Sequence, residues 1–386
     1  MERMVPVKEG HLSRDVLIAM HETPGIGWRT IRRLWEMGPR AALRPGITEK
    51  ELQDLGLRPE AAAALAQGLS PERMEAGRRK RLAAGMKAVT WADPEYPDML
   101  LQIGDPPPVL YCIGRVDLLR RPVVGVVGTR GATAYGRQMA EELAAALSRA
   151  GVTVASGLAR GIDTAAHRGA LRGDGSTIAV LGLPADRIYP PDNRWLYREI
   201  ADHGLLVSEA PPGTPYHTGM FPSRNRIISG LSLCVVIAEA PVGSGALLTA
   251  EYAITQDRPV FVIPGPVTSP RGRGGLELLR EGTASALLDA GDILERFAAE
   301  IRALSGPSAG GLPDGAAKPA HSPSAAPGPL TEQESAIYEL ILDQPRTADE
   351  LAAHTGMGTG QLHVLLLALQ MKGKIRRLPG AVFAAV

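Results

Sequence analysis

Four glycine-rich segments carry arginine or hydroxyl side chains at the ends of short apolar runs. They read VVGVVGTRGATAYGR (123–137), VTVASGLARGID (152–163), FPSRNRIISG (221–230) and VVIAEAPVGSGALLTA (235–250). Glycine lets backbone N–H groups approach an anion closely, and the planar guanidinium of arginine fits a phosphate. Together the segments predict a surface that grips a phosphate-bearing ligand.

Arg130 is the central candidate, because its neighbours leave the backbone free to donate beside it. Arg224 and Arg226 flank Asn225, and alternate residues of an extended segment share one face, so both arginines could reach one ligand. One of them could instead form a structural ion pair, and Ser244 and Thr249 could equally serve helix start and packing. The candidate phosphate contacts are Gly128, Thr129, Arg130, Gly131, Arg160, Arg224, Asn225, Arg226, Ser244 and Gly245.

The first segment fits neither of two familiar phosphate motifs. The dinucleotide fingerprint requires G-x-G-x-x-G and an acidic residue about 20 positions later, and the P-loop requires G-x-x-x-x-G-K-[ST]. Here Gly125, Gly128 and Gly131 have the wrong spacing, and Arg137-Gln138 stand where a P-loop has Lys-Ser. The sequence therefore favours neither NAD nor a nucleoside triphosphate with magnesium.

Few residues suggest catalysis or metal binding. Asp163 and His167 would share a helix face, which suits a metal or acid–base pair, but Asp163 is also a good N-cap for the helix that follows. Glu209 and Glu239 follow strands, and we expect them to orient the arginines of the site. The sequence has no G-x-S-x-G or H-E-x-x-H motif. We expect no enzyme activity and no metal site.

Composition places limits on the class of protein. Of the 386 residues, 45% are hydrophobic, but no apolar run approaches the length of a membrane span, and the first residues lack a signal-peptide core. Cys112 and Cys234 lie in apolar runs and predict buried side chains. The net charge is +1, so nucleic-acid affinity would require local clustering of basic side chains. These features predict a soluble cytoplasmic protein without membrane contact.

Strand and helix signals alternate through the middle of the chain. Val- and Ile-rich runs lie at 123–127, 152–155, 177–181, 205–207, 233–238 and 260–263, and helical patterns lie at 136–150, 164–172, 193–203, 223–230 and 246–256. This alternation predicts an α/β fold with a Rossmann-like, doubly wound, mostly parallel sheet. Ligands bind such sheets beyond the carboxyl ends of the strands, where the four segments should converge.

The flanking regions predict further domains. We expect a helical domain at 1–85, the α/β core at 86–304, a flexible Gly/Pro/Ala/Ser linker at 305–329 and a winged helix-turn-helix at 330–386. In the first, PGIG (24–27) is typical of a helix-hairpin-helix turn, with Gly25, Gly27 and Arg29 as candidate auxiliary DNA contacts; the alternative is a helical packing module. In the last, the second helix of the turn is rich in leucine and has no arginine, which favours a protein contact or self-association over duplex reading. Lys372, Lys374, Arg376 and Arg377 keep DNA contact open.

Residues 91–297 resemble the DNA-processing protein A (DprA, or Smf) family. The resemblance rests on motifs in order: GVVGTRGATAYG, VASGLARGIDTAAHRGAL, TIAVLG, YPPDN, LLVSEAPPGTP, FPSRNRIISGLS, GSGALLTAEYA and VFVIPGPV. It implies an extended Rossmann-like core that forms a homodimer, binds single-stranded DNA without a cofactor and loads the recombinase RecA during natural transformation. The family's DNA-binding GTR loop maps to Gly128, Thr129 and Arg130, with the arginines of FPSRNR nearby.

The chain departs from the family pattern in three places. Pro184-Ala185-Asp186 replaces Gly-Leu-Asp, Gly243-Ser244-Gly245 replaces Lys-Ser-Gly, and Leu276 replaces a polar residue. The second change removes a basic contact, for which Arg271 and Arg273 could compensate. Aromatic side chains near the segments could stack on bases or belong to the core; these are Tyr135, Tyr189, Tyr216 and Phe221.

Two other functions fit parts of the sequence. A Rossmann-type nucleotide-processing enzyme would cleave an N-glycosidic bond, but its P-G-G-x-G-T-x-x-E motif is absent from the sequence. A winged-helix transcription regulator is disfavoured by the composition of that helix. The sequence therefore favours a single-stranded DNA-binding recombination mediator.

Overall fold

The structure is a computed structural model that describes residues 13–305, 330–372, 374–378 and 382–385. The chain forms two compact units, residues 1–312 and residues 313–386. The expected linker at 305–329 lies, apart from its first residue, outside the described residues. The boundaries of the domains at 1–85 and 86–304 remain predictions, since both regions belong to the first unit.

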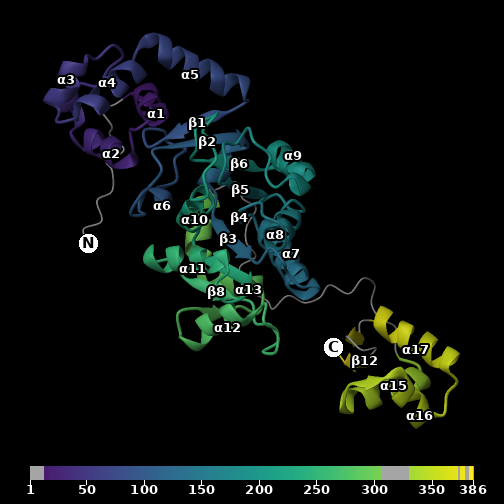
Figure 1. The fold of residues 1–386 in the computed structure, drawn as a ribbon. Coiled ribbons are helices and arrows are strands. Elements are labelled where there is room, and N and C mark those ends of the chain that lie inside the picture. The colour runs from purple at the N-terminus through teal and green to yellow at the C-terminus, as the bar shows by residue number, and fades with distance from the viewer. Residues whose placement is uncertain (1–12, 306–329, 373, 379–381, 386) are drawn as a thin grey trace. The chain divides into compact units, whose positions relative to one another are not determined.

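A nine-stranded sheet forms the centre of the first unit (Figure 1). Its order is β1-β2-β6-β5-β4-β3-β7-β8-β9, in which β1–β2 and β2–β6 are antiparallel and all other pairs are parallel. The strands are β1 (Lys87–Thr90), β2 (Val109–Gly114), β3 (Val123–Gly128), β4 (Thr153–Ser156), β5 (Thr177–Leu181), β6 (Leu205–Ser208), β7 (Val235–Glu239), β8 (Val260–Val262) and β9 (Ser285–Ala286). The six expected strands and the doubly wound fold class are confirmed, whereas β1, β2 and β9 were not expected.

Helices cover both faces of this sheet, because alternate side chains of each buried strand point to opposite faces. Val124 and Val126 pack with the α7 side, whereas Val123 and Val127 pack with the α10 side. Figure 1 shows these two helical layers on either side of the strands. One layer holds α7 (Ala134–Arg149), α8 (Ile162–Ala170), α9 (Arg194–His203), α13 (Ala290–Arg296) and α14 (Ala298–Ser305); the other holds α6 (Asp98–Leu101), α10 (Met220–Leu231), α11 (Gly245–Thr255) and α12 (Arg273–Arg280).

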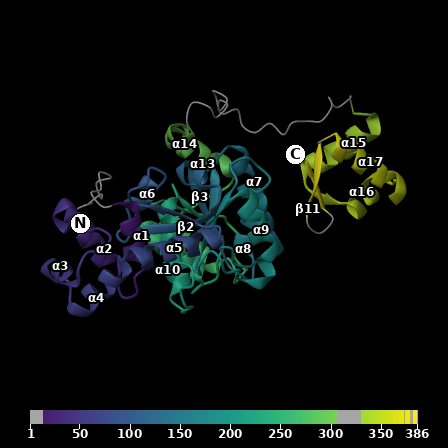
Figure 2. The ribbon, with the colours of Figure 1, turned by 90° about the horizontal axis from the view of Figure 1, so that it is seen from above.

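Five further helices gather at the end of the sheet formed by β1 and β2 (Figure 2). They are α1 (Arg14–Glu22), α2 (Trp28–Glu36), α3 (Glu49–Asp54), α4 (Pro59–Gly68) and α5 (Pro71–Ala83). Leu17, Leu65 and other apolar side chains of these helices share one hydrophobic core with the sheet. Short 3-10 helices lie at η1 (Gly38–Ala41), η2 (Val116–Arg120) and η3 (Pro191–Asn193). The expected helical N-terminal region is thus present and packs directly on the sheet.

The second unit has the expected winged-helix elements. They are α15 (Glu332–Asp343), β10 (Arg346–Thr347), α16 (Ala348–Thr355), α17 (Thr359–Met371), β11 (Ile375–Leu378) and β12 (Val382–Ala385), with strand order β10-β12-β11. Gly356, which opens the turn between α16 and α17, adopts a left-handed φ of 69° that favours glycine. Among the described residues of both units, no helix has the length and apolar character needed to cross a membrane.

Candidate functional site

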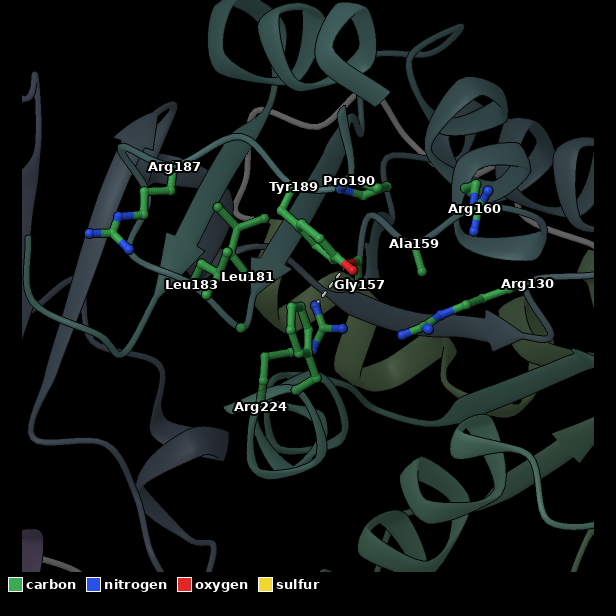
Figure 3. Close-up of a pocket in the computed structure, with 12 residues that line it drawn as sticks. Arg130, Gly157, Ala159, Arg160, Leu181, Leu183, Arg187, Tyr189, Pro190 and Arg224 are labelled. Carbon is green, nitrogen blue, oxygen red and sulfur yellow. Dashed lines mark hydrogen bonds between the residues drawn. The ribbon is translucent and has the colours of Figure 1, made fainter. Parts of the chain in front are cut away.

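A hollow lies at the carboxyl ends of β3, β4 and β5. Figure 3 shows Arg130 and Arg160 at one side, Arg187 at the other, and Arg224 and Tyr189 between them. Its lining residues are Arg130, Gly157, Ala159, Arg160, Leu181, Gly182, Leu183, Arg187, Tyr189, Pro190, Phe221 and Arg224. Four arginines from three loops and one helix therefore surround one cavity, where parallel sheets bind ligands.

Arg130 projects from the β3–α7 loop with an exposed side chain. It forms no ion pair with any residue that the structure describes. The backbone beside it is less free than the sequence suggested, because the Thr129 N–H donates to the Glu239 carbonyl oxygen at 2.7 Å and the Gly131 N–H to Thr129 Oγ1 at 3.2 Å. The expectation that these amides remain available to a ligand was wrong for Thr129. The guanidinium is what this loop offers to an anion.

The β4–α8 loop packs against the loop that carries Arg130. Gly161 adopts a φ of 82°, and a side-chain carbon there would approach the Arg130 carbonyl oxygen to 2.6 Å. The Ile162 N–H donates to the Thr129 carbonyl oxygen at 3.2 Å. Arg160, in the same loop, is two-thirds exposed and lies 3.5 Å from an oxygen of Asp192. Glycine at position 161 therefore brings two arginine-bearing loops into contact.

Arg224 forms the floor of the hollow. Its Nη1 donates to the carbonyl oxygens of Gly157, at 2.9 Å, and of Val180. Burial lowers the pKa of this guanidinium to about 10, the charge of Asp163 opposes that shift, and the charge of Arg130 adds to it. Arg224 thus places a buried positive charge beneath the exposed one of Arg130.

Arg226 does not line the hollow. The FPSRNR segment belongs to α10 and is not extended, so the expectation that Arg224 and Arg226 face the same way was wrong. Two residues apart on a helix differ in direction by about 200°. Arg226 Nε lies 2.8 Å from Asp105 Oδ2 and Nη2 lies 2.7 Å from Glu209 Oε1, with only 6% of the side chain exposed. Of the two roles considered for this arginine, ligand contact and a structural ion pair, the structure shows the ion pair.

The two glutamates at the ends of strands have different roles. Glu209 orients an arginine, as expected, although that arginine is Arg226. Glu239 pairs with no arginine among the residues that the structure describes: its carboxylate accepts hydrogen bonds from the Thr133 N–H at 2.7 Å and from Thr133 Oγ1 at 2.9 Å. That part of the expectation was wrong. Glu239 instead fixes the turn that begins α7.

Asp163 and His167 form hydrogen bonds within the protein. The Asp163 carboxylate accepts from the Gly157 and Ala159 N–H groups, while His167 Nε2 accepts from the Leu158 N–H and Nδ1 bonds Thr177 Oγ1. Burial raises the pKa of Asp163 and lowers that of His167 to about 3. Asp163 lies inside α8, with Gly161 as the N-cap residue, so its expected N-cap role was wrong. In the part of the chain that the structure describes, no cluster of three His, Cys, Asp or Glu could hold a metal ion.

The fourth segment contacts the site indirectly. Asn225 Nδ2 donates to the Gly245 carbonyl oxygen at 3.2 Å, and Asn225 Oδ1 accepts from Arg224 Nε at 3.3 Å. Ser244 caps α11 by accepting a hydrogen bond from the Ala246 N–H. Its observed contact is therefore the one expected of a residue that starts a helix. Neither Ser244 nor Gly245 lines the hollow. This segment therefore positions α10.

Among the residues proposed as auxiliary contacts, Arg271 approaches the loop that carries Arg130. Its Nη1 would lie 2.6 Å from a side-chain carbon at Gly131. Arg273 pairs with Glu277 at 3.1 Å within α12. Gly25 and Gly27 form the turn between α1 and α2, with Arg29 exposed in the first turn of α2. None of these residues lines the hollow.

Aromatic rings flank the arginines. The Tyr189 and Phe221 rings are 5.2 Å apart, the Tyr216 and Phe221 rings 6.3 Å, and both tyrosines are exposed. Tyr135 lies elsewhere, where its hydroxyl donates to the Pro264 carbonyl oxygen. Arg187 was missed by sequence reasoning, although a basic residue shortly after the predicted strand at 177–181 was an available signal.

Fold and site together define a Rossmann-like protein with a basic, aromatic-flanked pocket at one edge of its sheet. Comparison with known proteins identifies the group. The family model of DNA recombination-mediator protein A matches residues 87–298, and the DprA winged helix domain matches residues 321–381. The chain belongs to the DNA recombination-mediator protein A family.

Individual relatives agree. Protein Smf of Synechocystis is 39% identical over 75% of this chain and 77% of its own, and DNA processing protein DprA of Bacillus subtilis is 40% identical over 55% and 72%. The X-ray structure of Streptococcus pneumoniae DprA matches with a TM-score of 0.65 at 32% identity, covering 73% of this chain and 98% of that one. A Helicobacter pylori DprA structure, described for its single-stranded DNA binding mode, matches with a TM-score of 0.52 at 31% identity, covering 57% and 99%.

Proposed function

We propose that this protein binds single-stranded DNA in the arginine-lined hollow, protects incoming DNA and loads RecA onto it during natural transformation. The observation that carries the proposal is the convergence of Arg130, Arg160, Arg187 and Arg224 on one cavity. Family membership supports a role as a recombination mediator. The Helicobacter pylori relative is described as binding single-stranded DNA, and the same ligand suits the pocket of this chain.

The chemistry of the hollow suits one strand better than a free nucleotide or a duplex. Guanidinium groups bind successive phosphates without reading sequence, and aromatic rings stack on bases that are not paired. Arg130 is exposed above the buried Arg224, and Tyr189 and Tyr216 offer exposed ring surface beside Phe221. The net charge of +1 leaves these local charges as the source of affinity. The pocket can therefore hold backbone and bases at the same time.

Binding, protection and loading need no catalytic step by this chain. The titratable groups beneath the hollow, Asp163 and His167, are buried and hydrogen-bonded to the loops that carry the arginines. They shape the pocket. Release of free base from a nucleotide by the purified protein would instead support the N-glycosidic hydrolase alternative.

Self-association through the core is part of the proposal. The outward face of α11 exposes Leu248 and Ile254, two apolar side chains that a second copy could cover. A homodimer would place two pockets on one particle and so hold longer stretches of strand. A cytoplasmic location follows from the proposed partners, the incoming strand and RecA.

Fluorescence anisotropy with oligothymidylate and with duplex DNA tests the binding. Arg130→Ala should weaken single-strand affinity about 10- to 100-fold, the range of a charge-assisted contact. The slope of log K against log salt should fall by about 0.7. Arg280→Ala, an exposed arginine at the end of α12, is the matched control and should bind as wild type. Equal affinity of Arg130→Ala and wild type would reject this pocket as the site.

Loading is tested separately. RecA ATP hydrolysis on single strands covered by a single-strand-binding protein shows a lag while RecA nucleates. Wild type should shorten this lag, and Arg130→Ala should not. If the protein binds single strands tightly but the lag is the same as with RecA alone, the loading proposal fails and the proposed binding site is unaffected.

A further inference from the structure

Helix α5 presents a dense group of positive charges outside the hollow. Its 13 residues include five basic and two acidic side chains, and none of its residues is buried. Arg81 is used internally, paired with Glu22 at 2.6 Å. Arg78 and Arg79 share Glu75, at 2.7 Å and 3.8 Å, and Lys80 pairs with no carboxylate among the described residues. Ion pairs among the described residues therefore leave part of the positive charge of α5 unneutralised.

Lys80 lies against the loop between β6 and α10. A side-chain carbon at Gly213 of that loop would collide with Lys80 Nζ. Pro211 and Pro212 of the same loop line a groove together with Lys80 and Arg78. The exposed cations of α5 are thus next to the loop that follows β6.

The same loop reaches the hollow at its other end. Its residues 213 and 215–219 are exposed, and Tyr216 within it is 57% exposed. The Tyr216 ring lies 6.3 Å from that of Phe221, which lines the hollow beside Arg224. One exposed loop therefore connects the arginine-lined cavity to Lys80.

Sheet order gives this connection a direction. The hollow covers the carboxyl ends of β3, β4 and β5, and the next strands outward are β6, β2 and β1. Helix α5 packs beside β1 at that end of the sheet. A DNA strand that follows this edge of the sheet from Arg130 past Arg187 would next meet the β6–α10 loop and then α5.

We propose that single-stranded DNA leaving the hollow continues over residues 211–219 and that Lys80 and Arg79 bind its phosphates on α5. This inference rests on the proposed function, because it extends the same strand. Lys80 has a flexible stem and an ammonium group with no carboxylate partner among the described residues, and the 3.8 Å contact between Arg79 and Glu75 is long enough for a phosphate to replace. Tyr216 supplies a ring for one base between the two sets of cations.

Length dependence tests this path. Anisotropy is measured with oligothymidylates from about 4 to about 30 nucleotides, since single-strand sites in other proteins span a few to some 16 nucleotides. The double variant Lys80→Ala/Arg79→Ala should bind the shortest oligomers as wild type does. It should bind the longest about tenfold more weakly, with a salt slope smaller by about 1.4 for two lost phosphate contacts. The matched control is Lys50→Ala/Arg58→Ala, which removes one exposed cation in α3 and one just before α4.

The outcomes separate the inference from the proposed function. If wild type binds long oligomers and the Lys80→Ala/Arg79→Ala variant binds oligomers of every length with wild-type affinity, the path over α5 is wrong, and the proposed pocket is unaffected. If wild type binds no oligomer, the proposed function itself fails. Photo-crosslinking by 4-thiothymidine gives a second readout, with adducts expected in residues 71–83 only when the probe is near one end of a long oligomer. Adducts confined to the hollow would overturn the inference.

Discussion

Arg224 and Gly157 are in direct contact, and the arginine occupies the space that a side chain at position 157 would need. Arg224 Nη1 donates to the Gly157 carbonyl oxygen at 2.9 Å, and the guanidinium carbon would lie 2.7 Å from a Cβ atom there. The second carbonyl partner, Val180, is the last residue but one of β5. One side chain of α10 thereby links the loop after β4 to the carboxyl end of β5.

Gly157→Ala should displace Arg224 and so damage both stability and binding. The added methyl group overlaps a buried guanidinium, and overpacking of this kind typically costs about 1–3 kcal/mol. We expect a lower melting temperature and about tenfold weaker binding of short oligothymidylate. Differential scanning fluorimetry and anisotropy measure the two effects.

Gly104→Ala is the control for that substitution. Gly104 is exposed, and a side-chain carbon there would meet no atom within 4 Å. This variant should match wild type in both assays. Wild-type affinity of Gly157→Ala would show that the position of Arg224 is unimportant for binding.

Arg226→Ala should destabilise the fold while leaving the pocket chemistry intact. The guanidinium bridges Asp105 and Glu209 with 6% of its side chain exposed, and both carboxylates remain partly solvated at 44% and 29%. Removing one member of a buried pair costs about 3–5 kcal/mol, and solvation of the partners reduces this to about 2 kcal/mol. Urea denaturation measures the loss.

Arg79→Ala is the comparison, since the Arg79–Glu75 pair is exposed. Its urea midpoint should equal that of wild type. Arg226→Ala, at a temperature where it is folded, should bind short oligothymidylate normally. A large loss of affinity in a fully folded Arg226→Ala protein would contradict its role as a structural ion pair.

The sequence predicted the parallel strands well because each is a short, continuous Val- and Ile-rich run buried on both faces. It did not predict β1 and β2, because β2 pairs with β6, which is distant in the chain, and β1 pairs only with β2. Placing Arg224 and Arg226 on an extended segment failed for a local reason. Pro222 lies in the first turn of α10, where proline is compatible with a helix because the N–H groups there have no helical partner.

The site itself was predicted in part. The Arg130 loop and Arg160 could be located, because glycine-rich loops after parallel strands must meet at one edge of the sheet. The partners of Arg226 could not be predicted, since Asp105 is 121 residues away in the sequence. The use of the Thr129 amide by Glu239 likewise depends on the register between β3 and β7.

His167 should make folding stability fall as the pH is lowered below about 6.5. Burial lowers the pKa of the folded-state imidazole from 6.5 to about 3, so between these values the unfolded chain binds a proton that the folded chain does not. Burial also lowers the pKa of His21 to about 4, which acts in the same sense. Each contributes at most about 1.4 kcal/mol per pH unit.

The test is urea denaturation between about pH 5 and pH 7 of wild type and variants that all keep Asp163, because the raised pKa of Asp163 acts in the opposite sense. His167→Gln should be less stable at pH 7, because two hydrogen bonds are altered, but should show a shallower pH slope. His203→Gln, at an exposed position, should keep the wild-type slope. An unchanged slope in His167→Gln would contradict the buried neutral imidazole.

Both cysteines should be inert in the folded protein. Cys112 and Cys234 are buried, and burial raises the pKa of the Cys112 thiol to about 12 and that of Cys234 further still. Because the thiolate is the reactive form, a thiol reagent such as dithionitrobenzoate should label neither residue before unfolding. Labelling of both in denaturant is the control, and rapid labelling of the native protein would show that these strands open readily.

The winged-helix unit should be dispensable for single-strand binding. Leu362, Leu366 and Leu369 of α17 are buried in the core of that unit, so most of the apolar character of this helix serves its own packing. Val364 alone among its described leucines and valines is exposed, and it offers no hydrogen bond to a base. Residues 1–312 form a compact unit of their own, and truncation after Ser305 should therefore leave short-oligomer affinity and the effect of Arg130→Ala unchanged.

The affinity of the truncated protein for duplex DNA, measured by anisotropy, should also equal that of the full chain, since α17 lacks the arginine and lysine side chains that bind a major groove. A loss of duplex binding on truncation would instead assign DNA contact to Lys374 and the strand that follows it.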